Sequence, residues 1–150
     1  GSITVFSFVP RRLDMSNKDK NDDDLGFKIL DWTSFLGISD RAFYNVKNVV
    51  NIELPSALKY IGEHAFEDSF IESITMQNLD NIGNFAFKNC PRLAEVNLTQ
   101  GVQNIGTEAF YGVANLREIT FPSELQYVGP GAFADCTLLN KGDGIMHRAL

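Results

Sequence analysis

The sequence is poor in cysteine, in proline and in long apolar runs, and each shortage excludes a class of protein. Two cysteines among 150 residues do not make a disulfide scaffold. With 5 Pro and 12 Gly, the chain is neither collagen-like nor of low complexity. No apolar run approaches the roughly 18 residues of a membrane-spanning helix, so we expect no membrane insertion. Acidic residues outnumber basic ones by 19 to 13, and the net charge of −6 disfavours nucleic acid as a partner because its phosphates are repelled.

The rest of the composition is that of an ordinary globular protein. A hydrophobic content of 44% excludes a fully disordered chain, and a length of 150 residues favours one domain. Gly1 and Ser2 resemble a cloning scar. For residues 1–26 we expect a strand over residues 3–9, ended by Pro10, and then a polar loop. That strand either caps the repeats that begin near residue 27 or belongs to a preceding domain.

An internal repeat organises the chain from residue 27 onwards. An Ala-Phe pair recurs five times, at intervals of 23, 21, 23 and 23 residues. A second motif has the form apolar-x-x-apolar-x-apolar, and its middle residues are Leu30, Ile52, Ile74, Val96 and Ile119. These middle residues are spaced by 22, 22, 22 and 23 residues. Two landmarks that keep one period indicate a stack of similar structural units.

Each repeat unit has features that predict its local structure. The apolar motif alternates with polar residues, as in Ile52-Glu53-Leu54, and therefore predicts a short half-buried strand. A following Ile or Val returns the chain to the core, and the glycine after it in four of five copies indicates a positive φ or a close backbone approach. The Ala-Phe pair fits a single helical or 3₁₀ turn whose Phe fills the core. Such a unit cannot bury its apolar face alone, so we expect a right-handed coil with about five parallel strands.

One late copy carries the pattern most fully. It reads Leu-Arg-Glu-Ile-Thr-Phe-Pro over residues 116–122 and Val-Gly-Pro-Gly-Ala-Phe over residues 128–133, followed by Cys136. These residues resemble the BspA-like leucine-rich repeats. The resemblance implies an α/β, strand-dominated leucine-rich repeat solenoid with short helical or 3₁₀ turns over residues 27–139, and an irregular tail or an interrupted array over residues 140–150. It also implies a secreted or cell-surface protein associated with adhesion.

The outward residues of the expected strands define a candidate binding surface, which we call the concave face. Its candidate residues are Asp31, Glu53, Thr75, Asn97 and Thr120 in a central column and Asn51, Glu95 and Glu118 beside it. The strand columns hold four carboxylates and no Lys or Arg, which favours a basic or hydroxyl-rich partner. They also lack aromatic residues, which argues against glycan binding.

These features predict a non-enzymatic protein-interaction or adhesion module, whose partner is a protein or a component of a host or microbial surface. The alternatives are a structural spacer that presents another domain and has no ligand of its own, or a sheet whose polar face is merely solvated. A hydrolase with its catalytic parts elsewhere has no support in these residues, because no nucleophile or phosphate-binding motif is present.

The residues that suggest other chemistry do not form a recognisable site. Cys90 and Cys136 occupy equivalent positions two coils apart, too far for a disulfide, so we expect two buried free thiols. His64 and His147 lack the spaced ligands of a zinc site. The acidic run at residues 19–24 lacks the Gly and Glu that an EF-hand loop requires. Asn97-Leu98-Thr99 is a formal glycosylation sequon on an expected strand. We expect no cofactor and no metal.

Overall fold

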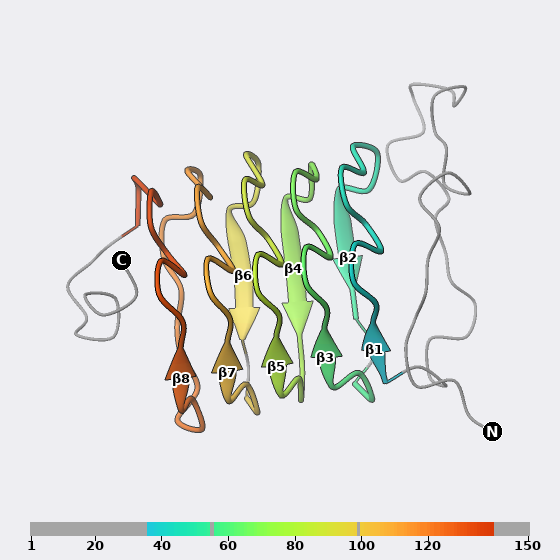
Figure 1. The fold of residues 1–150 in the computed structure, drawn as a ribbon, viewed down its shortest axis with the longest axis vertical. Coiled ribbons are helices and arrows are strands. Elements are labelled where there is room, and N and C mark those ends of the chain that lie inside the picture. Colours follow the sequence, from blue (N-terminus) through green and yellow to red (C-terminus); the bar gives the residue numbers. More distant parts are fainter. Residues whose placement is uncertain (1–35, 55, 99, 140–150) are drawn as a thin grey trace.

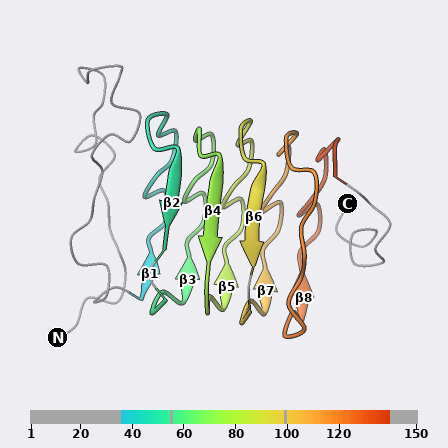
Figure 2. The ribbon, with the colours of Figure 1, turned by 180° about the vertical axis from the view of Figure 1, so that it is seen from behind.

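The fold is a stack of coils in which equivalent strands of successive coils run parallel, shown from opposite sides in Figures 1 and 2. The computed structural model describes residues 36–54, 56–98 and 100–139. The strands within these residues are β1 (Gly37–Ile38), β2 (Asn51–Glu53), β3 (Tyr60–Ile61), β4 (Ser73–Met76), β5 (Asn81–Ile82), β6 (Glu95–Leu98), β7 (Asn104–Ile105) and β8 (Tyr127–Val128). The predicted strand-dominated solenoid is confirmed.

The strands form two parallel sheets. β2, β4 and β6 make a three-stranded sheet from the apolar motif that the sequence indicated. β1, β3, β5, β7 and β8 make a five-stranded sheet from the Ile or Val that returns the chain to the core. The sequence did not predict this second sheet, because strands of two residues are too short to show the alternation that marks a strand.

The sheet of the apolar motif has fewer strands than the five expected. The copy around Leu30 lies outside the described residues. Residues 116–121 are described, but they form no strand and make no backbone hydrogen bond to β6. Two sequence differences accompany this gap: Phe121 stands where the three copies that form β2, β4 and β6 have Leu or Met, and Glu118 follows Glu95 in its column. A larger core side chain and adjacent like charges both oppose close strand pairing.

The phenylalanines of the Ala-Phe pairs form a ladder through the core. Its rings are Phe43, Phe66, Phe87, Phe110 and Phe133, all essentially without solvent exposure. Neighbouring ring centroids lie 4.9, 5.1, 5.1 and 5.2 Å apart, and the rings are nearly parallel. These separations are close to the spacing of adjacent strands, so each coil contributes one ring. The predicted core position of the Phe, and of the equally buried Ala beside it, is confirmed.

The turn that carries each Ala-Phe pair is not helical, which corrects the sequence-based expectation. The described residues contain no helix, and each pair lies in consecutive turns. The Ala42 N–H donates within its own turn to the Ser39 carbonyl at 3.2 Å. The Phe43 N–H donates instead to the Ala65 carbonyl of the next coil at 2.7 Å. The residue before the Ala has a positive φ, for example 60° at Phe85, and a left-handed residue interrupts a right-handed helix.

The glycine after the Ile or Val allows close packing between coils. Of the two alternatives expected for this glycine, a positive φ does not occur at Gly83 or Gly106. A Cβ added at Gly106 lies 2.6 Å from the backbone nitrogen of Asn84 in the preceding coil. At Gly83 the added Cβ lies 2.7 Å from the carbonyl oxygen of Ile61. The predicted close backbone approach is therefore confirmed.

Several expectations concern residues outside the described part of the chain. They are the strand and loop of residues 1–26 with its acidic run, the tail of residues 140–150 with His147, and the candidate Asp31. These stay predictions. Within the described residues, no helix has the length and apolar character needed to cross a membrane.

Candidate functional site

The register of β2, β4 and β6 builds the concave face. Strand pairing aligns Asn51, Ser73 and Glu95 in one column and Glu53, Thr75 and Asn97 in the next. The alternate residues point into the core: Ile74 and Val96 are 1% and 6% exposed. Two neighbours in the first column are in contact, since Ser73 Oγ donates to Asn51 Oδ1 at 2.6 Å. The face therefore consists of polar side chains at strand spacing.

The predicted site residues do not all join this aligned surface. Register brings together Asn51, Glu53, Thr75, Glu95 and Asn97. Glu118 and Thr120 are exposed on the next coil, in a segment that does not pair with β6. Asp31 lies outside the described residues. The columns predicted from sequence are thus continuous over three strands and interrupted before the fourth copy.

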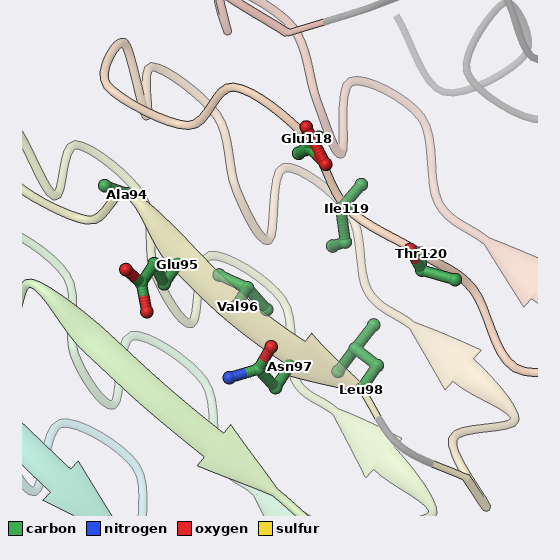
Figure 3. A pocket seen from close by; sticks show the side chains of 8 residues that line it. All are labelled: Ala94, Glu95, Val96, Asn97, Leu98, Glu118, Ile119 and Thr120. Carbon is green, nitrogen blue, oxygen red and sulfur yellow. The ribbon is translucent and has the colours of Figure 1, made fainter.

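A hollow of about 390 Å³ occupies this interruption. It is lined by Ala94, Glu95, Val96, Asn97, Leu98, Glu118, Ile119 and Thr120 (Figure 3). In Figure 3 the side chains of Leu98 and Ile119 lie between the backbone of β6 and that of residues 118–120. The exposed carboxylates of Glu95 and Glu118 are the charged groups of the lining, which contains no basic residue. The hollow therefore combines an apolar floor with an acidic rim.

A second hollow, of about 340 Å³, lies on the same face, and the cationic side chain of Arg92 is part of its lining. It is lined by Asn51, Glu72, Ser73, Arg92, Ala94, Glu95 and Asn115. Ala94 and Glu95 line both hollows, so the two are adjacent. The Arg92 guanidinium lies 4.0 Å from the centre of the Phe70 ring, and Lys47 Nζ lies 4.5 Å from it. Both cations therefore make a cation–π contact with the same ring, and Lys47 Nζ also donates to the Asp68 carbonyl. Sequence reasoning missed Arg92 because it precedes the alternating strand residues and follows no period.

The two cysteines are structural. Neither forms a disulfide, and both are fully buried, as predicted. The Cys90 thiol donates to the Phe66 carbonyl and the Cys136 thiol to the Phe110 carbonyl, each at 3.0 Å. Burial raises the pKa of Cys90 to about 12, so the reactive thiolate is scarce at neutral pH. These thiols satisfy backbone acceptors inside the core and do not form a reactive site.

Charged and aromatic side chains form pairs along the Ala-Phe turns. His64 Nδ1 is hydrogen-bonded to the Glu67 carboxylate, and the His64 ring lies 4.8 Å from the Phe85 ring. Lys88 Nζ donates to Glu108 Oε1 at 3.0 Å, and this hydrogen bond raises the pKa of Lys88. The opposite charges of Lys88 and Glu108 compensate each other locally. No group of three or more His, Cys, Asp or Glu suited to a metal ion occurs within the described ranges.

Coils with parallel strands, an outward polar column and a core ladder of phenylalanine define this protein as a leucine-rich repeat solenoid. The model of the BspA type leucine rich repeat region matches residues 28–140 in six copies. The chain therefore belongs to the BspA-type leucine-rich repeat family, which confirms the resemblance seen in the sequence.

Solved structures of two bacterial proteins are similar to this chain. A leucine-rich repeat protein of T. pallidum, TpLRR, is 30% identical with a TM-score of 0.69, over 71% of this chain and 50% of that one. The pneumococcal vaccine antigen PcpA is 26% identical with a TM-score of 0.64, over 72% of this chain and 27% of that one. The chain thus matches half or less of the length of these two proteins. No curated relative matches the sequence.

Proposed function

We propose that this chain is a non-enzymatic protein-interaction or adhesion module, which binds its partner through the concave face. The observation that carries the proposal is the register of β2, β4 and β6, which sets polar side chains in columns on one sheet surface. Stacked repeats present extended surfaces of this kind for binding. Leucine-rich repeat proteins in general are protein-interaction modules, and this chain belongs to one of their families.

The charges of the face indicate the partner's chemistry. Glu95 and Glu118 line the first hollow without a basic neighbour in its lining, and the whole chain carries a net charge of −6. Basic side chains on a partner surface would be attracted to these carboxylates, and this attraction raises the rate at which the two proteins associate. Arg92 in the second hollow favours a hydrogen-bond acceptor or a carboxylate beside those basic groups.

We also propose that the protein is secreted or displayed on the cell surface. The similarity to PcpA supports this location, because PcpA is a vaccine antigen. A host or microbial surface component is then the kind of partner that the protein meets. The structural spacer is the alternative, and it makes the opposite prediction for binding.

Charge reversal on the concave face tests the proposed function. The variant Glu53→Lys, Glu95→Lys, Glu118→Lys changes the charges of the face and leaves the buried residues intact. We expect saturable binding of the labelled chain to epithelial cells or immobilised extracellular matrix, and a loss of at least about tenfold in affinity in the variant.

A second triple variant provides the matched control. Glu63→Lys, Asp80→Lys and Glu124→Lys make the same change in net charge outside the concave-face columns. We expect this control to bind nearly as well as the original chain. Equal binding by the concave-face variant contradicts the proposal, and the absence of saturable binding by the original chain favours the spacer.

A further inference from the structure

Within the described residues, the backbone pairing of the concave-face sheet is interrupted at one place, between β6 and residues 117–121. β2 pairs with β4, and β4 with β6, whereas residues 117–121 make no backbone hydrogen bond to β6. Elsewhere the same two coils remain in contact: β7 pairs with β8, and the Phe110 and Phe133 rings stack at 5.2 Å. The coils are therefore in register, and only their concave-face segments separate.

The opening leaves one edge of β6 without a neighbouring strand. The Glu95 N–H donates to the Glu72 carbonyl, on the β4 side, at 3.4 Å. Because successive residues of a strand direct their N–H and C=O groups to alternate edges, Val96 and Leu98 direct theirs towards residues 117–121. No described backbone group of that segment bonds to them. An edge of this kind is a template for the addition of a strand from another chain.

The hollow beside this edge has the chemistry of a site for an alternating strand. Its floor is apolar, since Val96 and Leu98 are 6% exposed and Ile119 is half-buried beside them. Its rim carries the exposed carboxylates of Glu95 and Glu118. Successive side chains of an added strand point to opposite faces, so one set meets the floor and the other set meets the rim.

We propose that the opening between β6 and residues 117–121 binds an extended segment of a partner protein, which adds as a strand between them. The segment alternates apolar residues, which contact Val96, Leu98 and Ile119, with arginine or lysine residues, which pair with Glu95 and Glu118. The inference rests on the proposed function, because it names the part of the concave face that recognises the partner and the chemistry of the recognised segment.

Synthetic peptides test strand addition directly. The probe is an acetylated and amidated heptapeptide in which valine and arginine alternate. Two controls are the same peptide with glutamate for arginine, and the arginine peptide with N-methyl groups on alternate amides along one edge. Binding is followed by amide chemical shifts of the whole chain in solution. We expect changes centred on residues 94–98 and 117–121, and at least about tenfold weaker binding of both control peptides, because one loses charge pairing and the other loses backbone hydrogen bonds.

A variant that closes the opening provides a second measurement. Glu118→Ser with Phe121→Leu introduces at these positions residues found in the paired strands, as at Ser73 of β4 and Leu98 of β6. We expect slower amide hydrogen exchange at residues 117–121 and loss of peptide binding, with the fold retained. Met76→Leu, on the paired strand β4, is the matched control and is expected to bind the peptide normally.

The outcomes separate this inference from the proposed function. Shift changes elsewhere, no shift changes, equal binding of the N-methylated peptide, or full binding by the closing variant each overturn strand addition. If charge reversal of the concave face still weakens cell or matrix binding in those cases, the proposed function stands and only strand addition is wrong. If charge reversal has no effect while the peptide binds as expected, the site exists but does not serve the proposed adhesion.

Discussion

Replacing Phe87 by alanine tests the packing on which the whole solenoid depends. The Phe87 ring is fully buried and lies between the Phe66 and Phe110 rings, with both centroids at 5.1 Å. A buried Phe→Ala truncation costs about 3–5 kcal/mol in unfolding free energy, and each aromatic neighbour contributes about 0.5–1.5 kcal/mol beyond area burial. With a ring on each side, we expect a loss of about 4–5 kcal/mol for Phe87→Ala.

The assay is thermal and urea unfolding followed by circular dichroism. For a chain of this length, each kcal/mol lost from the unfolding free energy lowers the melting temperature by about 2–4 °C. We therefore expect the melting temperature of Phe87→Ala to fall by about 8–20 °C. Phe85→Ala is the matched control, because Phe85 belongs to the same turn but is only half-buried. We expect the control to lose about 1 kcal/mol. Equal melting temperatures of the two variants, or a Phe87→Ala variant as stable as the original chain, refute the assignment of the ladder as the core.

Three individual contacts give further predictions. Gly106→Ala places a Cβ 2.6 Å from the backbone of the preceding coil, so we expect about 1–3 kcal/mol of destabilisation in urea unfolding, and an unchanged midpoint contradicts the close approach. Cys90 and Cys136 are expected to react with a thiol reagent only after unfolding in urea, and rapid labelling of the native chain at pH 8 contradicts their burial. Glu108→Gln replaces the carboxylate acceptor that raises the pKa of Lys88 by a neutral amide oxygen, so Lys88 titrates at lower pH by NMR. Because the folded pKa is raised, the stabilisation from this pair is present at neutral pH and is lost as pH rises through the folded pKa, above the ordinary value of 10.5.

The periodic features of this protein were predictable from sequence because periodicity reports which side chains face inward. The repeated Ala-Phe pair predicted the buried ladder that contains Phe87, and the alternation around Ile74 predicted the outward columns of the concave face. The absence of a helix at the Ala-Phe turn was not predictable, because the turn depends on hydrogen bonds to the next coil. Those bonds join residues more than twenty positions apart, such as Phe43 and Ala65.

The sequence by itself determined the stacking, since no single coil buries its own apolar residues and a constant period aligns them all. Only the tertiary structure decided where the stack departs from regularity. Phe121 and Glu118 look like ordinary members of their columns in the sequence, yet β6 has no strand partner on their side. Arg92 likewise reaches the concave face through contact with Phe70 from a neighbouring coil. Such features arise from the fit between side chains of adjacent coils, and a pattern read along one chain does not contain that fit.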